Sequence, residues 1–413
     1  MTLEKVLFAA VLSVTTVACG TTSSNGGGDD GGGGGGGGGG GSGSNGGSGT
    51  TPSNWTEMPL SSGHDDDAVT AIYFASPSQG LIATAGSESS SGGIFNAAAT
   101  SVTGISFDGS SSNDLEFYGF AKTPTGYYAY TDIEETVVGD STGKFSDLGA
   151  NGTQAGNVSQ VLGAYVTATD TVLVTKEALW QAASVPGASA DYTAIFAPPP
   201  ADPTVPDDFP STDCQDGPSP NDPVFINMAS VAISSDGKTI VYAAASDADG
   251  VPEVCVSTNG GSVFLPTELP GTSAVAPSGI VFPNPAEPST LIVYSAQTDN
   301  DAGANFIMRS TNGGTSFQPV AIPSSLASKS MEFDYAFFAP DGQHGWIIGL
   351  DDDADLGLAL VTTDGGQTWA EDTTGIANVD PANEERLRAG FALDATHVWI
   401  GGDHGVLFAY TPQ

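Results

Sequence analysis

Three aspartates on alternate residues, followed by glycine, form the pattern in this chain that looks most like a metal-binding loop. They are Asp351, Asp353 and Asp355 of the stretch DDDADLG, which ends at Gly357. Carboxylates at this spacing can wrap oxygen ligands around Ca²⁺. One interpretation is therefore a divalent-cation site or a docking rim for a basic partner. The other is a solvated hairpin tip in a protein that is acidic throughout. We predict no cofactor other than this Ca²⁺.

Further acidic residues fall where they could extend such a rim. Two come from equivalent loops of the preceding units, and two come from earlier loops. They are the pair Asp247 and Asp249, the pair Asp299 and Asp301, and the ranges 64–67 and 132–135. If the units are arranged in register, these loops lie on one face.

Two cysteines are candidates for a disulfide. Cys214 lies in a Pro/Asp-rich insertion at 198–223, and Cys255 lies in a β-rich run. The third cysteine, Cys19, belongs to the N-terminal export signal described below. One remaining pair in an exported chain predicts a bridge. The bridge would fasten the insertion to that run and stabilise the fold by about 3–4 kcal/mol. The alternative is a buried free thiol at Cys255 and an exposed one at Cys214.

Three eight-residue stretches recur at starts 53 and then 52 residues apart: STNGGSVF, STNGGTSF and TTDGGQTW. A period near 50 residues indicates a repeat architecture. An Asp or Asn side chain accepts backbone hydrogen bonds in its own turn, and the following glycine adopts a positive φ without steric cost. The aromatic residue begins the next strand. We call these stretches the box turns, and each is expected to close a hairpin.

The box turns resemble the Asp-box, or BNR, repeat of sialidases, sortilin-type receptors and photosystem II assembly-factor-like β-propellers. The matching positions are Ser257, Asn259, Gly261 and Phe264, then Ser310, Asn312, Gly314 and Phe317, and finally Thr362, Asp364, Gly366 and Trp369. Asn259 and Asn312 replace the acid but keep its acceptor oxygen. The resemblance implies a β-propeller in which the motif is a structural fastener away from the ligand face.

Seven similar hairpins follow one another, each an apolar run, a turn and a second apolar run. They begin at Ala71, Phe117, Leu162, Ser230, Gly279, Phe337 and Gly390. The fuller units contain four strands, which is the composition of a propeller blade. We therefore predict an all-β, seven-bladed propeller of four-stranded antiparallel sheets, with six or eight blades as alternatives. The last unit lacks its fourth strand, and the segment from Asn54 to Leu60 is expected to supply it.

A sialidase-like active site is not apparent. Such a site needs three arginines converging on a carboxylate, and the chain contains only Arg309, Arg386 and Arg388. Arg386 and Arg388 lie two residues apart at one strand entry, and Arg309 directly precedes a box turn. We therefore predict that the protein is not an enzyme and assign no catalytic residue.

The N-terminus predicts export. Residues 1–19 comprise a short basic start and an apolar run that ends in Thr-Val-Ala-Cys19, and this resembles a bacterial lipoprotein signal in which Cys19 is lipidated. An ordinary secretory signal is the alternative. A Gly-rich tether follows at 20–52, which cannot bury enough surface to fold, and the propeller occupies 53–413. The residues after Cys19 lack an Asp retention signal, which favours the outer membrane.

The charge narrows the range of partners. There are 48 acidic and 9 basic residues, giving a formal net charge of −39. Such a surface repels nucleic acid, which we exclude as a partner. We predict a monomer held at the membrane by its lipid anchor, acting as a binding or assembly scaffold for a protein or glycan. The alternatives are a glycan-acting, sialidase-like hydrolase and a Ca²⁺-dependent carbohydrate or adhesin module.

Overall fold

The structure of the chain is a computed structural model. It describes residues 54–410 apart from gaps at 61–62, 87–90, 110–116, 124–125, 132–135, 141–144, 148–160, 167–170, 176–178, 183–192, 197–213, 215–230, 245–251, 271–276, 296–304, 328 and 377–385. The predicted signal, the tether, Cys19 and the acidic pairs Asp247/Asp249 and Asp299/Asp301 lie outside the described residues, as does the range 132–135. Of the insertion at 198–223, Cys214 is described.

The described residues form seven four-stranded antiparallel sheets. The first three, in chain order, are β2–β5 (Ala68–Ser76, Gln79–Ala85, Gly93–Ala98, Ser101–Asp108), β6–β9 (Phe117–Thr123, Gly126–Thr131, Thr136–Asp140, Phe145–Asp147) and β10–β13 (Val161–Val166, Thr171–Thr175, Leu179–Ala182, Thr193–Phe196). The next three are β14–β17 (Val231–Ile233, Ile240–Ala244, Glu253–Ser257, Leu265–Glu268), β18–β21 (Gly279–Val281, Leu291–Tyr294, Ile307–Ser310, Gln318–Val320) and β22–β25 (Met331–Phe338, Gly345–Asp351, Leu356–Thr362, Ala370–Glu371). The last contains β26–β28 (Leu387–Asp394, His397–Gly402, Leu407–Tyr410) and β1 (Trp55–Glu57).

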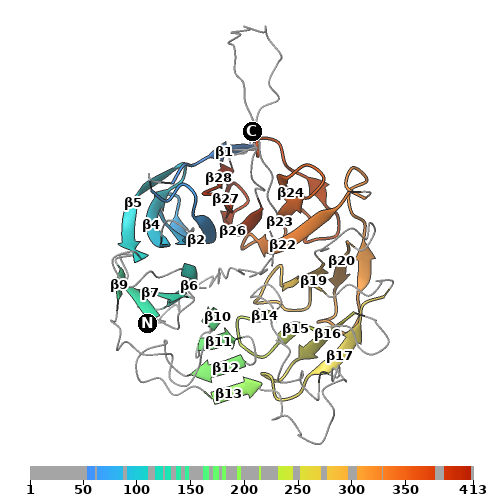
Figure 1. The fold of residues 1–413 in the computed structure, drawn as a ribbon. Helices are drawn as coiled ribbons and strands as arrows, with labels where there is room; N and C mark the ends of the chain where they lie inside the picture. The colour runs from blue at the N-terminus through green and yellow to red at the C-terminus, as the bar shows by residue number, and fades with distance from the viewer. Residues whose placement is uncertain are drawn as a thin grey trace, which may run out of the picture.

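The sheets are arranged in a ring around a common axis, with the first strand of each sheet towards the centre (Figure 1). Neighbouring sheets contact one another through these inner strands, as β2 does with both β26 and β6. This confirms the all-β propeller. Seven sheets are present in the described ranges, and the blade count of the whole chain stays a prediction.

The ring is closed by its N-terminal strand, as the sequence predicts. β1 pairs antiparallel with β28, so that Trp55 lies opposite Tyr410 and Glu57 opposite Phe408. The Trp55 side chain is 2% exposed. The first and last strands therefore share one sheet, which removes an open sheet edge.

The inner strands carry a recurring β-bulge. In five of the seven described sheets the register shifts near the start of the first strand, leaving one extra residue. In β22 that residue is Asp334 and in β26 it is Arg388. A glycine lies opposite each of these two bulges. A Cβ at Gly349 would lie 1.9 Å from the Glu332 carbonyl oxygen, and one at Gly402 would lie 1.8 Å from that of Arg386, so neither position has room for a side chain. A bulge redirects the side chain that it carries.

The three box turns share one hydrogen-bonded conformation. In the first, Ser257 Oγ donates to Asn259 Oδ1 at 2.8 Å and accepts from Gly261 N at 3.0 Å. The second and third repeat these contacts through Ser310 and Thr362. The two adjacent glycines of every box turn have positive φ. Asn and Asp therefore perform the same role in this turn.

The box turns also fasten neighbouring sheets. A Cβ at Gly314 would lie 2.8 Å from Val256 of the preceding sheet, and one at Gly366 would lie 2.5 Å from Ile292. Arg309 extends this contact, because its Nε donates to the Gly365 carbonyl oxygen at 2.9 Å. The box turns are thus packing elements. They lie on the face of the ring where the inner strands end, opposite the face where those strands start.

Candidate functional site

The acidic loop after β23 does not gather its carboxylates around one point. Asp351 ends β23 and pairs with Lys329 Nζ at 2.5 Å, while Asp353 accepts from Ser330 N at 3.2 Å. In the described part of the chain, three ligand atoms of His, Cys, Asp or Glu come within 4.8 Å of one another at a different place, Cys214, Glu253 and Cys255. The geometry therefore gives no support to a Ca²⁺ site at Asp351, Asp353 and Asp355.

The charged side chains concentrate instead at the starts of β22 and β26. Arg386 immediately precedes β26, and its Nη1 forms ion pairs with Glu332 and with Asp334, the latter at 3.4 Å from Oδ1. Arg388 makes a two-point contact with Asp403, with Nε 2.5 Å from Oδ1 and Nη2 2.8 Å from Oδ2. We call these five residues the ion-pair cluster.

The two bulges position the cluster. They place Asp334 and Arg388 at equivalent points of two neighbouring inner strands, which contact each other. Asp403 follows β27, and its backbone N–H donates to the Arg386 carbonyl oxygen at 2.9 Å. The cluster therefore joins the last two sheets of the ring at the end away from the box turns.

Burial sets the electrostatics of the cluster. The Glu332 side chain is 11% exposed and that of Asp334 is 20% exposed. Burial raises the pKa of both carboxyl groups, although Arg386 acts in the opposite direction. Burial opposes the charged form of Arg386 as well, but Asp334 and then Glu332 raise its pKa above the ordinary value. The arginine is thus held as a cation by the carboxylates that it neutralises.

Acid outnumbers base at this end of the ring. Three cations, Lys329, Arg386 and Arg388, lie among six carboxylates that belong to the same contacts: Glu332, Asp334, Asp351, Asp352, Asp353 and Asp403. Two buried oxygens, Asp334 Oδ2 and Asp351 Oδ1, have no hydrogen-bond partner. A buried acceptor without a donor is costly, and its presence in a native structure needs an explanation.

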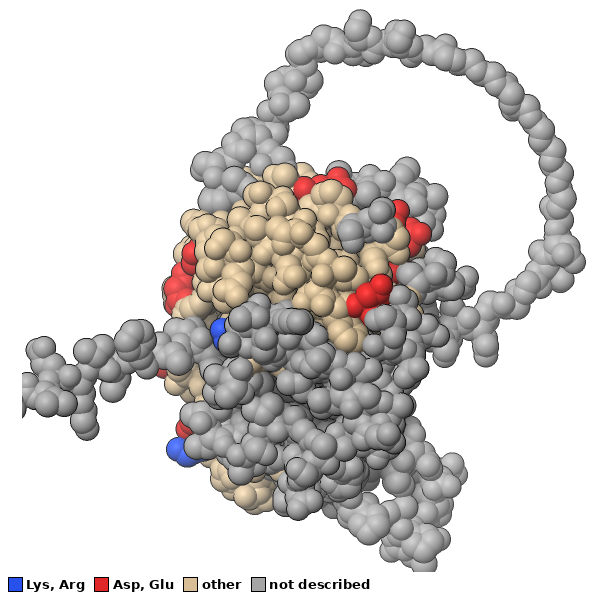
Figure 2. All heavy atoms as spheres, turned by 90° about the vertical axis from the view of Figure 1, so that its left-hand side faces the viewer, with Lys and Arg blue, Asp and Glu red and all other residues tan. Residues whose placement is uncertain are grey.

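The segment before β2 continues this face. Gly405, in the turn after β27, donates its N–H to the Asp67 carbonyl oxygen at 2.9 Å. His64 Nδ1 lies 2.7 Å from Asp67 Oδ2. Of the expected rim, the structure therefore brings the range 64–67 next to the turn that carries Asp403. Figure 2 shows another side of the ring, on which red Asp and Glu lie among tan uncharged residues.

The pairing within the cluster was not predicted from the sequence, although a signal for it exists. Glu332 and Arg386 are 54 residues apart, and so are Asp334 and Arg388. Glu-Phe-Asp in one repeat thus occupies the positions of Arg-Leu-Arg in the next. Opposite charges at equivalent inner-strand positions of adjacent repeats predict contacts across the boundary between the sheets.

The chain's three arginines do not converge. Arg309 binds the third box turn, whereas Arg386 and Arg388 lie at the opposite end of the sheets and contact carboxylates. All the arginines of the sequence are described. The carboxylate-binding arginine triad of a sialidase-type site is therefore not formed.

The two candidate cysteines are joined in the structure. Cys214 and Cys255 form a disulfide with their Cα atoms 5.6 Å apart. The bridge attaches the insertion to β16 in the fourth sheet.

None of the described residues belongs to a helix that is long and apolar enough to cross a membrane.

Comparison with known proteins shows the fold. No protein-family model and no curated protein matches the sequence. Among solved structures, YCF48 from Cyanidioschyzon merolae is 13% identical with a TM-score of 0.58, over 87% of this chain and 99% of that one. A structure of YCF48 bound to D1 peptide is 13% identical with a TM-score of 0.54, over 88% and 96%.

An enzyme has a similar fold. The GH74 xyloglucanase from Xanthomonas campestris is 14% identical with a TM-score of 0.54, over 88% of this chain and 54% of that chain. The similar structures thus include a peptide-bound protein and a glycan hydrolase. At this low sequence identity, the structural similarity shows that the chain is a β-propeller, and it does not distinguish between those two activities.

Proposed function

We propose that the protein is a non-catalytic, lipid-anchored β-propeller of the cell envelope that binds a protein partner on the face carrying the ion-pair cluster. The observation that carries this proposal is the excess of carboxylates there, together with the unpaired oxygen of Asp334. That chemistry suits a partner segment that presents Lys or Arg. A cationic group reaching the cluster would satisfy the oxygen after a rotation of the carboxyl group.

The architecture supports a scaffold. The shared sheet closes the ring without an open edge, and a preorganised face would lose little conformational freedom on binding. A propeller of similar fold has been solved with a peptide bound, and we extend peptide binding to this chain as part of the proposal. Complementary charge would accelerate encounter and select against acidic partners.

The contacts of the arginines support the non-catalytic part of the proposal. Arg386 and Arg388 are already engaged by Glu332, Asp334 and Asp403, so they are not arranged to receive a substrate carboxylate. The proposed function and a hydrolase make different predictions for glycans. Release of sugar from xyloglucan or from a fluorogenic sialoside by the purified protein would overturn the non-catalytic assignment.

Peptide binding tests the proposed face. Wild type is expected to bind a labelled Arg/Gly peptide in saturable fashion at a salt concentration of about 0.15 M, where distant charges are screened. Asp334→Asn should weaken binding by about tenfold because it removes a desolvated charge partner. Fluorescence anisotropy measures both affinities.

Asp341→Asn is the matched control, because it removes one carboxylate charge from an exposed turn at the box-turn end. It should change affinity by no more than about twofold, as expected for an exposed charge. Equal losses in the two variants, or no saturable binding by wild type, would contradict the proposal.

The lipid anchor is a separate part of the proposal and has its own test. Cells expressing the chain with an alkyne fatty acid in the medium should yield labelled protein in the membrane fraction. Cys19→Ala should abolish the label, because it removes the thiol that accepts the lipid. Labelling that survives this substitution would refute attachment at Cys19.

A further inference from the structure

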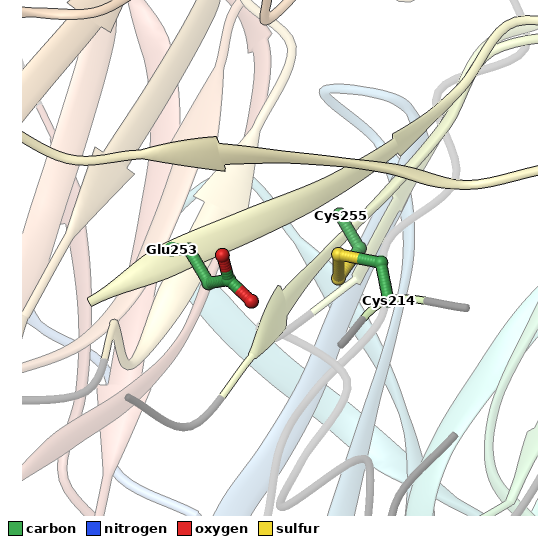
Figure 3. Close-up of side chains that lie close together, drawn as sticks. All are labelled: Cys214, Glu253 and Cys255. Carbon is green, nitrogen blue, oxygen red and sulfur yellow. A yellow bond between two sulfur atoms is a disulfide. The ribbon is translucent and has the colours of Figure 1, made fainter. Parts of the chain in front are cut away.

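A buried carboxylate lies beside the disulfide. Glu253 and Cys255 are two residues apart in β16, so their side chains project from the same face of the strand. Cys214 reaches that face from the insertion (Figure 3). The two sulfurs and a Glu253 carboxylate oxygen all lie within 4.8 Å of one another.

The three groups are shielded from water. Cys255 is fully buried, Cys214 is 3% exposed and Glu253 is 6% exposed. Tyr242 lies opposite Cys255 in the sheet and packs against Phe264 with ring centroids 5.1 Å apart. Burial, and then the charge of Glu253, raises the pKa of Tyr242. A carboxylate in such surroundings is stabilised by a nearby cation.

We propose that reduction of the Cys214–Cys255 disulfide creates a binding site for a thiophilic divalent cation such as Zn²⁺, with Glu253 as its third protein ligand. A dithiol reductant transfers two electrons and two protons to the S–S bond, giving two thiols, and becomes a cyclic disulfide. The cation then displaces both thiol protons to solvent. Two thiolates and one carboxylate leave a fourth position for water, as in sites with three protein ligands.

The bridge itself keeps the oxidised protein from binding. In the disulfide each sulfur is bonded to the other and carries no negative charge, and metals require the thiolate. In the oxidised protein both sulfurs already lie beside Glu253, so the proposal requires only that they separate enough to bind one cation while they stay on this face of β16. The proposal thus links the redox state of the pair to metal occupancy.

Metal titration tests the proposal on the full chain with Cys19→Ala, which removes the third thiol. The protein is reduced with a phosphine, desalted without oxygen and titrated with Co²⁺ as a spectroscopic substitute for Zn²⁺. One equivalent should bind and give the thiolate-to-cobalt charge-transfer band, and Zn²⁺ should displace it. The oxidised protein should give no such band.

Three variants on the same background identify the ligands. Cys214→Ser should abolish tight binding, and Glu253→Gln should weaken it by about tenfold or more. Glu268→Gln is the matched control, because Glu268 lies opposite Glu253 in β17 but is exposed, and it should change affinity by no more than about twofold.

Two kinds of result would overturn the proposal. One is reduced protein that binds Co²⁺ no more tightly than Cys214→Ser, or equal losses in Glu253→Gln and Glu268→Gln. The other is loss of the β-sheet circular dichroism on reduction, because the three ligands would then no longer be held together.

Discussion

Replacing Trp55 with alanine is expected to lower the free energy of unfolding by about 3–5 kcal/mol, the range for truncating a buried large aromatic side chain. Trp55 is 2% exposed and packs on Tyr410 with ring centroids 5.0 Å apart. Its indole N–H donates to the Asp372 carbonyl oxygen at 2.9 Å, which ties the closing strand to the neighbouring sheet. Urea unfolding measures the loss, and it is followed by far-UV circular dichroism because that signal reports backbone structure rather than tryptophan fluorescence.

Closure gives the same variant a second signature. When β1 detaches, β28 becomes an exposed edge whose amides exchange freely and which can pair with other chains. Hydrogen exchange should therefore accelerate first in β28, and aggregation on heating should increase. Glu57→Ala is the control, because Glu57 belongs to the same strand but is exposed. A Trp55→Ala variant as stable as Glu57→Ala would show that the ring does not depend on this strand.

The fold could be predicted because the sequence repeats its local signals. Each of the seven predicted hairpins overlaps the first two strands of one described sheet, and the box turns recur at almost constant spacing. The closing strand was recognisable because its aromatic residue and proline match the outer strands of other units. Local propensity and repetition agree here, and such consistency makes a sequence readable.

The ion-pair cluster was not predicted because bulges obscure strand periodicity. The sequence places the last two inner strands from Phe337 and Gly390, whereas β22 begins at Met331 and β26 at Leu387. The bulged residues Asp334 and Arg388 lie in the parts of β22 and β26 that come before Phe337 and Gly390, which the sequence prediction left out. An extra residue breaks the alternation of inward and outward side chains, so the start of the strand looks like a loop.

The acidic loop shows how context overrides spacing. Alternate carboxylates suggest a common ligand, but the residues from Asp352 to Asp355 form a turn, in which alternate side chains no longer share a face. Lys329, 22 residues earlier, pairs with Asp351. Because the chain has so few lysines and arginines, an ion pair between this lysine and the acidic loop was not apparent from the sequence.

Replacing Arg386 with methionine is expected to lower the free energy of unfolding at neutral pH by about 2–4 kcal/mol. Breaking a buried ion pair costs about 3–5 kcal/mol because it leaves an unpaired charge, and partial exposure of Glu332 and Asp334 reduces this. Methionine preserves much of the side-chain volume, so that the loss reports charge and hydrogen bonding. Urea unfolding at neutral pH provides the measurement.

The cost should depend on pH in a defined direction. Burial raises the folded-state pKa of Glu332 and Asp334 above the unfolded values near 4. The folded state therefore binds more protons between the unfolded and the folded pKa, and stability from these groups rises as pH falls through that window. Loss of the arginine raises the folded pKa further, so the Arg386→Met deficit should shrink as pH is lowered from 7 towards about 4.

A triple variant separates the ion pair from the packing. Adding Glu332→Gln and Asp334→Asn to Arg386→Met removes the unpaired charges while keeping the shapes, and should recover most of the lost stability and its pH dependence. A deficit that persists at pH 4 and in the triple variant would mean that Arg386 acts through its aliphatic stem. Recovery of stability in the triple variant would show that charge pairing in the cluster holds the last two sheets together, because its carboxylates destabilise the ring whenever their cation is absent.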